Sequence, residues 1–421
     1  MMSAAAATAA LATIGVTRVQ GAAPACDPDN GGITLPAGFC ALVVADDLGP
    51  ARHMAVAPNG DVYVATLGGR SVPGAPLVAM RDADGDGKFE VKERFGESSA
   101  TGIALHNGYL YVGTPTEIVR YKMTAGTLKP TGPREVVVGG FELQRQHEDK
   151  GVAFDGKGSL YINVGAPSNA CQSPDRRAKV PGQDPCPLLE QFGGIWKFDE
   201  NKLGQKQSDG TRYATGLRQP VAIAWHDGAL YAAMNSRDQL DTLWPDLFKA
   251  EDNVQRPSEP LYRVEPNSNF GWPYCMHDFT LNKLILNPEY GGDGKAVGRC
   301  TQFKEPIAAF PAHWAPVDLM FYTGSQFPQK YRGGAFIAFH GSWNRSPMPQ
   351  DGYNVTFQPF ANGKVSGKYE VFADGFAGKS PLMRPNDATY RADGVAQAPD
   401  GSLYVSESQK GRVWRVMYTG R

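Results

Sequence analysis

His147 is well placed for chemistry, because it stands just ahead of two short apolar segments joined by a turn rich in Gly and Asp, within residues 146–165. A histidine there can act as a general base, since its unperturbed pKa of about 6.5 leaves it neutral at working pH. The same position also suits an ordinary loop histidine whose hydrogen bonds are satisfied. Proton transfer at His147 is therefore a hypothesis.

A second pattern could bind a metal ion. The stretch Asp82-Ala83-Asp84-Gly85-Asp86-Gly87-Lys88-Phe89-Glu90-Val91-Lys92-Glu93 follows the spacing of an EF-hand calcium loop. No helices are evident on either side, which favours an acidic turn between strands, or a structural Ca²⁺ loop, over a calcium sensor. The ligands that this pattern predicts are Asp82, Asp84, Asp86 and Glu93.

The hairpin after His147 recurs along the chain, and this repeat must position the residues ahead of it. Each of six copies combines a turn with a strand that carries an aromatic residue, although the fifth copy is degenerate. Asn-Gly and Asp-Gly turns supply the positive φ of a tight hairpin, and the alternation that follows places one side chain between neighbouring sheets. The aromatic residues are Tyr63, Tyr111, Tyr161, Tyr231, Phe336 and Tyr404.

The spacing of these aromatic residues indicates the fold. The first two spacings, 48 and 50 residues, suit a four-stranded sheet, and the longer ones predict insertions on one face. We expect an all-β fold, a six-bladed β-propeller with loop insertions, as a single domain over 26–421. A pair of β-sandwiches is the weaker alternative, because the repeat runs through the whole chain. His106 and His226 fall at the turns, so we expect them to be turn residues.

Composition narrows the function. The chain has 421 residues, a net charge of -1 and no long run of like charge, so it lacks the basic footprint expected for nucleic acid or an anionic membrane. Its 49 Gly and 32 Pro favour many short strands and turns over helices.

The first 25 residues read as an export signal. Residues 3–16 are almost wholly small and apolar, and Ala23-Pro24-Ala25 resembles a cleavage site, although no basic residue precedes the apolar run. A disordered tail is the alternative. No other stretch is apolar enough to span a bilayer. We expect a periplasmic or secreted protein.

The cysteines support export. Six cysteines allow fifteen pairings, and the simplest is the local one: Cys26 with Cys40, Cys171 with Cys186, and Cys275 with Cys300. No Cys-x-x-Cys motif is present. Disulfides in an oxidising compartment are the favoured interpretation, with buried free thiols as the alternative.

Several segments, in their order along the repeat, resemble one family. They are His147 ahead of its hairpin, Gly-x-Arg-x-Pro at 216–220, Arg-Asp at 237–238, Phe-Gly-Trp-Pro at 270–273 and His-Gly-Ser-Trp-Asn-Arg at 340–345. Together they make the chain similar to the soluble glucose/sorbosone dehydrogenases, and closest to the L-sorbosone dehydrogenase branch. These enzymes use pyrroloquinoline quinone (PQQ) and are built as six-bladed propellers.

The resemblance implies roles for particular residues. His147 would take a proton from a substrate hydroxyl while hydride passes to the quinone carbon, and Arg218 would stabilise charge on the quinone oxygens. Arg391 and Arg345 would pair with the carboxylates of PQQ. Gln146 and Gln219 complete the implied cofactor-binding set. Both differ from the family pattern, which has an acid at the first position in glucose-oxidising members and Asn at the second, so they bear on sugar specificity.

The resemblance also implies a Ca²⁺ ion on PQQ. The ligands would be largely backbone carbonyls at Asn235 and Ser236, with Asp238 nearby, and the ion would polarise the quinone. His313 and His340 either line the substrate mouth or are core histidines.

The resemblance therefore predicts a quinoprotein that oxidises an aldose or a sorbosone-like sugar aldehyde to a lactone or acid. Electrons would leave to a cytochrome, quinone or dye. Two alternatives stay open. A lactonase-like metal-dependent hydrolase would need carboxylate or Asn ligands converging on the axis, and a noncatalytic ligand-binding propeller would need only the hairpins.

Overall fold

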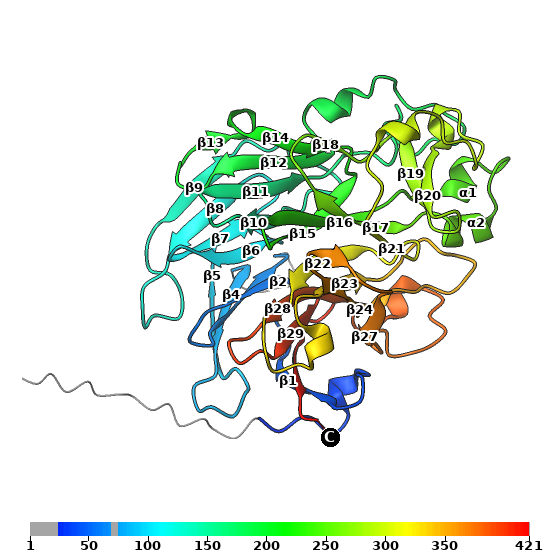
Figure 1. The fold of residues 1–421 in the computed structure, drawn as a ribbon. Helices are drawn as coiled ribbons and strands as arrows, with labels where there is room; N and C mark the ends of the chain where they lie inside the picture. The colour runs from blue at the N-terminus through cyan, green and yellow to red at the C-terminus, as the bar shows by residue number, and fades with distance from the viewer. Residues whose placement is uncertain (1–23, 69–74, 421) are drawn as a thin grey trace, which may run out of the picture.

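The computed structural model describes residues 24–68 and 75–420, so most of the predicted export signal, residues 1–23, lies outside the described part. Six sheets of four or five strands are arranged in a ring (Figure 1). The first three sheets contain β2 (Ala51–Val56), β3 (Val62–Thr66), β4 (Leu77–Arg81) and β5 (Val91–Phe95); β6 (Ile103–His106), β7 (Tyr109–Gly113), β8 (Ile118–Lys122), β9 (Arg134–Gly139) and β13 (Gln205–Lys206); and β10 (Val152–Phe154), β11 (Ser159–Val164), β12 (Gly194–Asp199), β14 (Thr211–Thr215) and β18 (Ser268–Asn269).

The other three sheets complete the ring. They contain β15 (Gln219–His226), β16 (Ala229–Asn235), β17 (Glu259–Val264) and β21 (Ala308–Phe310); β22 (Pro316–Phe321), β23 (Ala335–His340), β24 (Tyr353–Gln358) and β27 (Glu370–Ala373); and β28 (Ala392–Gln397), β29 (Leu403–Glu407), β30 (Val413–Tyr418) and β1 (Phe39–Ala45). The inner strands contact one another in a closed order, β2, β6, β10, β15, β22, β28 and back to β2. The predicted six-bladed propeller is thereby confirmed.

The ring closes through the first strand. β1 pairs antiparallel with β30, from Phe39 opposite Tyr418 to Ala45 opposite Val413, and so becomes the outer strand of the last sheet. A tight turn is absent from the fifth hairpin, where a loop with a 3₁₀ turn at Gln329–Tyr331 joins β22 to β23, which explains why that sequence copy is degenerate.

The core lies between neighbouring sheets. The six repeated aromatic residues are each at most 4% exposed and belong to the apolar clusters that fill these layers. This confirms that alternation in the second strand of each hairpin directs one large side chain into the interface between sheets. His106 ends β6 and His226 ends β15, beside their turns as predicted.

Insertions cluster at one side of the ring. α1 (Leu240–Leu243), α2 (Ala250–Gln255), β19 (Cys275–Asp278) and β20 (Lys283–Leu286) lie together there (Figure 1), and β25 (Phe360–Ala361) pairs with β26 (Lys364–Val365) elsewhere. The disulfides are Cys26–Cys40, Cys171–Cys186 and Cys275–Cys300, which confirms the predicted pairing. Among the described residues, no helix is long and apolar enough to cross a membrane.

Four inner strands contain a register shift, in β2 between Ala51 and Met54, in β15 between Gln219 and Ala222, in β22 between Pro316 and Asp318, and in β28 between Ala392 and Val395. Such bulges redirect side chains and are common beside functional sites. These four lie at the beginning of their strands, where the strands converge on the axis of the ring.

Closure of the ring predicts a sensitive position. Trp414 in β30 is completely buried, packs against Phe376 and Tyr390, and donates its indole N–H to the Gly31 carbonyl. We expect Trp414→Ala to lower the free energy of unfolding by about 3–5 kcal/mol, the usual cost of removing a buried aromatic ring. Trp343→Ala is the matched control, since Trp343 is 52% exposed. Equal denaturation midpoints for the two variants would contradict this account of closure.

Candidate active site

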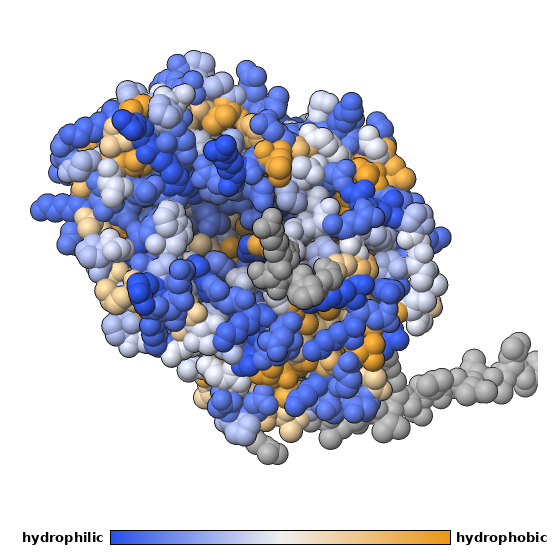
Figure 2. Space-filling model, turned by 180° about the vertical axis from the view of Figure 1, so that it is seen from behind, coloured by the Kyte–Doolittle hydropathy of each residue, from blue (hydrophilic) through white to orange (hydrophobic). Residues whose placement is uncertain are grey.

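A polar cavity of about 330 Å³ opens where the inner strands begin. Figure 2 shows a hydrophilic face with a hollow near its middle and only small hydrophobic patches. The cavity is lined by Arg52, His147, Asp149, Arg218, Gln219, Val221, Asn235, Ser236, Asp238, Glu259, His313, Ala315, Val317, His340, Gly341, Trp343, Asn344 and Arg391. The structure therefore brings together predicted residues that are up to 244 positions apart in the chain, from His147 to Arg391.

His147 faces this cavity with a defined tautomer. Its Nδ1 lies 2.5 Å from the carbonyl oxygen of Ala166. A carbonyl can only accept, so Nδ1 carries the proton and donates, and Nε2 of the neutral ring holds the lone pair. Burial, together with the nearby charge of Arg218, lowers the pKa of His147 to about 3. His147 is therefore a neutral proton acceptor over the physiological pH range.

Glycine at position 165 allows this arrangement. A Cβ at Gly165 would lie 2.1 Å from Gln219 Oε1 and 2.8 Å from His147 Cβ, so any side chain there would displace both residues. His147 itself has a φ of 60°, a left-handed conformation that is uncommon outside glycine. The loop behind it is fixed by Asn163, which accepts from the Gly151 N–H and donates to the Asp149 carbonyl.

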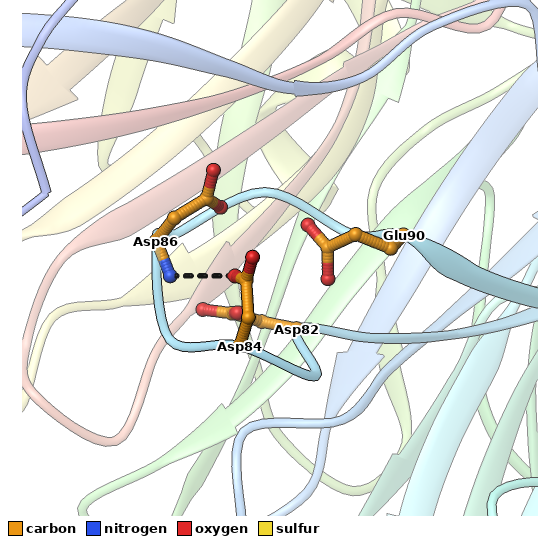
Figure 3. A group of neighbouring side chains, drawn as sticks. All are labelled: Asp82, Asp84, Asp86 and Glu90. Carbon is orange, nitrogen blue, oxygen red and sulfur yellow. Dashed lines mark hydrogen bonds between the residues drawn. The ribbon is translucent and has the colours of Figure 1, made fainter.

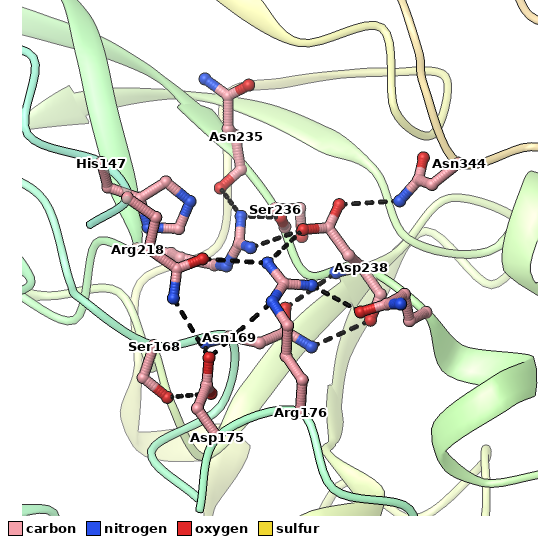
Figure 4. A network of polar contacts seen from close by, with 12 residues as sticks. His147, Ser168, Asn169, Asp175, Arg176, Arg218, Asn235, Ser236, Asp238 and Asn344 are labelled. Carbon is pink, nitrogen blue, oxygen red and sulfur yellow. Dashed lines mark hydrogen bonds and ion pairs between the residues drawn. The ribbon is translucent and has the colours of Figure 1, made fainter.

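Arg218 is buried and binds the residues predicted to hold calcium. Its Nη1 donates to the carbonyls of Ser236 at 2.5 Å and Asn235 at 3.4 Å, and its Nη2 donates to Asp238 Oδ2 at 2.6 Å (Figure 4). Its Nε is buried without a partner among the described residues. Burial lowers the pKa of Arg218, but Asp238 opposes this effect.

Asp238 is the centre of this network. Its Oδ2 also accepts from Arg176 Nη2 at 2.9 Å, and its Oδ1 accepts from Asn344 Nδ2 at 2.8 Å (Figure 4). Burial alone would raise the pKa of Asp238, but the two guanidiniums outweigh burial and hold the pKa well below its usual range. Glu259 differs, because burial and the charge of Asp238 raise its pKa to about 8.

Arg391, His313 and His340 also face the cavity. Arg391 donates from Nε to the His340 carbonyl and from Nη2 to the Gly341 carbonyl. His340 Nε2 lies 2.6 Å from Ser408 Oγ, and burial holds its pKa well below 6.5. His313 donates from Nε2 to the Asn253 carbonyl. Both histidines line the cavity and are held by the surrounding strands and loops.

Two residues of the implied cofactor set lie outside the cavity lining. Arg345 donates to the carbonyls of Pro349, Val254 and Ala312, which holds a loop beside the site. Gln146 donates to Pro167 and Asp175 and accepts from Arg176, so it supports the network behind His147. The implied cofactor contacts of these two side chains are not supported by their positions.

The acidic loop joins two strands, as the absence of flanking helices predicted. Asp82, Asp84 and Asp86 approach Glu90 between β4 and β5, with carboxylate oxygens within 4.8 Å of one another (Figure 3). Glu93, predicted as the last ligand, is instead in β5 and pairs with Lys129 at 3.3 Å. The EF-hand register is wrong at that position, because a strand that begins at Val91 directs Glu93 away from the loop. Metal binding by the loop stays a prediction.

Sequence reasoning missed several residues that line the cavity. Arg52 pairs with Asp393 at 2.7 Å, Asp149 accepts from Thr101 at 2.5 Å, and Glu259 accepts from the Ser236 N–H at 2.9 Å. Arg52 and Asp149 could have been found, because each stands 11 or 12 residues ahead of a hairpin aromatic residue. Glu259 follows no hairpin and had no such signal.

A comparison with known families decides the relationship. The TrAA12-like family model matches residues 33–419, nearly the whole chain. The chain belongs to the TrAA12-like family.

Curated relatives of this TrAA12-like chain are distant. It is 28% identical over 280 residues to an uncharacterized protein of Borreliella burgdorferi, a match that covers 65% of this chain and 61% of that protein. It is 26% identical over 266 residues to the pyrroloquinoline quinone-dependent pyranose dehydrogenase of Coprinopsis cinerea, which covers 55% of this chain and 35% of that protein. The chain thus matches less than two thirds of the length of either relative.

Solved structures share the TrAA12-like fold. The holo PQQ domain of the Coprinopsis cinerea pyranose dehydrogenase has a TM-score of 0.70 at 18% identity, with 91% of this chain and 97% of that chain covered. The calcium structure of the Trichoderma reesei Carbohydrate-Active Enzymes Family AA12 protein has a TM-score of 0.74 at 18% identity, with 92% and 97% covered. At such identities the similarity establishes the propeller fold.

The lowered pKa of His147 predicts a titration. We expect the imidazole of His147 to show no protonation by NMR between pH 5 and 8, with the signal assigned by its loss in His147→Gln. Since the folded pKa lies below the unfolded value of about 6.5, acid protonates the unfolded chain first. The contribution of His147 to stability is therefore complete above about pH 6.5 and is lost as the pH falls toward 3. A midpoint near 6.5 in the folded protein would contradict this environment.

Proposed function

We propose that this protein is a PQQ- and Ca²⁺-dependent sugar dehydrogenase. The observation that carries the proposal is the pairing, in one buried cavity, of a neutral histidine whose Nε2 holds a lone pair with the guanidiniums of Arg218 and Arg391. A base for a hydroxyl proton and cations for an anionic acceptor are the parts that hydride abstraction from a sugar requires. Membership of the TrAA12-like family and the named PQQ-dependent relatives support the same chemistry.

The residues present suit the two cofactors. PQQ is planar and carries carboxylates, and three guanidiniums, from Arg52, Arg218 and Arg391, line the cavity. Gln219 Oε1 and Arg218 Nε are buried without partners among the described residues, which leaves one acceptor and one donor for a ligand. Carbonyls of Asn235 and Ser236 with the Asp238 carboxylate form the set of oxygen atoms that Ca²⁺ prefers.

The residues of the chain would share the work as follows. When bound, PQQ supplies the hydride acceptor and Ca²⁺ polarises it. His147 Nε2 would accept the proton of the substrate hydroxyl, while the Nδ1–H donated to Ala166 keeps the ring oriented and stabilises the imidazolium. Arg218 and Arg391 would bind anionic oxygens, and the walls formed by Val221, Ala315 and Val317 would limit access of water.

The substrate class in this proposal is an aldose or a sugar aldehyde, including sorbosone-like compounds, with a lactone or acid as product. The electron acceptor would be a cytochrome, a quinone or a dye. The three disulfides support export to an oxidising compartment, periplasmic or extracellular.

A reconstitution experiment tests the function. Purified protein is loaded with PQQ and Ca²⁺, and dye reduction is measured with glucose, other aldoses and sorbosone. We expect turnover that needs both cofactors and falls at least about 100-fold in His147→Ala, the usual effect of removing a general base. His226→Ala is the matched control, because His226 ends β15 beside the hairpin turn and is absent from the cavity lining.

The outcomes separate the alternatives. Lack of PQQ binding by calorimetry would overturn the quinoprotein proposal and favour a noncatalytic binding propeller. Metal-dependent lactone hydrolysis without PQQ would favour the hydrolase. Full activity in His147→Ala would refute the role of this histidine.

A further inference from the structure

The oxygen atoms suited to Ca²⁺ are already bound to a cation from the chain itself. Arg218 Nη1 lies 2.5 Å from Ser236 O and 3.4 Å from Asn235 O, and Nη2 lies 2.6 Å from Asp238 Oδ2 (Figure 4). The guanidinium therefore contacts two backbone carbonyls and one carboxylate, all three of the proposed ligand residues. A divalent ion coordinated by the same oxygen atoms would have to compete with this side chain.

The environment requires a cation at this position. Asp238 is 8% exposed, Arg218 is 2% exposed, and a buried carboxylate without a partner is strongly unfavourable. Arg176 from the loop closed by Cys171–Cys186 also contacts Asp238 Oδ2, but it makes no printed contact with the two carbonyls. Arg218 alone among the described residues joins the carboxylate to both carbonyls.

The far side of the Arg218 side chain is only weakly held. Its Nε is buried without a partner among the described residues, whereas both Nη atoms bind the oxygen atoms of the calcium set. Loss of those oxygen atoms to another cation would leave all donors of the guanidinium unbound and beside a cavity. Donors in that situation favour an anionic ligand.

We propose that Arg218 occupies the calcium position in the cation-free protein and that Ca²⁺ displaces it, which releases the guanidinium to bind an anion in the cavity. This inference rests on the proposed function, because it concerns the same calcium and cofactor site. It gives Arg218 two successive sets of partners. The coupling that results is reciprocal, so an anionic cofactor that holds the released guanidinium also tightens the binding of Ca²⁺.

Calcium binding to PQQ-free protein tests the exchange without any enzyme activity. The affinity for Ca²⁺ is measured by calorimetry in wild type, Arg218→Met and Arg391→Met. We expect Arg218→Met to bind Ca²⁺ at least about tenfold more tightly than wild type, because the competing cation is gone. Arg391→Met removes the same charge from the same cavity, but Arg391 contacts only the carbonyls of His340 and Gly341, so its affinity should stay within about twofold of wild type.

Unchanged or weaker Ca²⁺ binding in Arg218→Met would overturn the exchange. Equal tightening in both variants would also overturn it, because general charge repulsion would then explain the result. No Ca²⁺ binding by any of the three proteins would overturn it as well. PQQ-dependent turnover that persists in wild type under any of these outcomes would leave the proposed function standing.

A second variant covers loss of folding in Arg218→Met. In Arg218→Ala, whose fold is checked by its melting temperature, free guanidinium ion at low millimolar concentration should weaken Ca²⁺ binding, because it can fill the vacated position. The same guanidinium concentration should leave Ca²⁺ binding to wild type unchanged. Absence of competition in Arg218→Ala would contradict the proposed occupancy.

Discussion

Closure of the ring is the constraint on which the rest of the structure depends. An isolated sheet of this kind would leave both faces exposed, and only a complete ring buries each face against a neighbour. Pairing of β1 with β30 joins the two ends of the chain in one sheet, so the apolar layers on both sides of that sheet form together. The cavity depends on the same closure, because its lining comes from strands and loops all around the axis.

Convergence of the inner strands explains the electrostatics of the site. Side chains directed by the bulges at the start of these strands meet in a region with little water, where burial disfavours every charged form. His147 and Glu259 respond by remaining neutral near pH 7. Asp238 remains charged because Arg218 and Arg176 lie beside it. The same burial therefore produces a base, a neutral acid and an ion pair within one cavity.

The repeat made the fold and part of the site predictable from sequence. Local chemistry specifies each hairpin, and the positions 11 to 14 residues ahead of the hairpin aromatic residues contain His147, Arg218 and Arg391. Residues outside that frame were not predictable. Arg345 follows the strand in its sequence motif, yet bonds to three backbone carbonyls direct it away from the cavity. Glu93 matched a loop pattern that ignores the strand beginning at Val91.

The insertions are the part of the site that periodicity cannot describe. Arg176 comes from the loop closed by Cys171–Cys186, and Asn253 in α2 accepts from His313 through its carbonyl. Each insertion thus supplies contacts to a residue that the repeat positions, and none of these contacts has a fixed sequence spacing. Since Asp238 receives hydrogen bonds from Arg176, Arg218 and Asn344, its charge is stabilised by the insertion, the repeat and a loop together. Changes in the insertions can therefore alter the cation affinity of the site while the propeller and its proton acceptor stay the same.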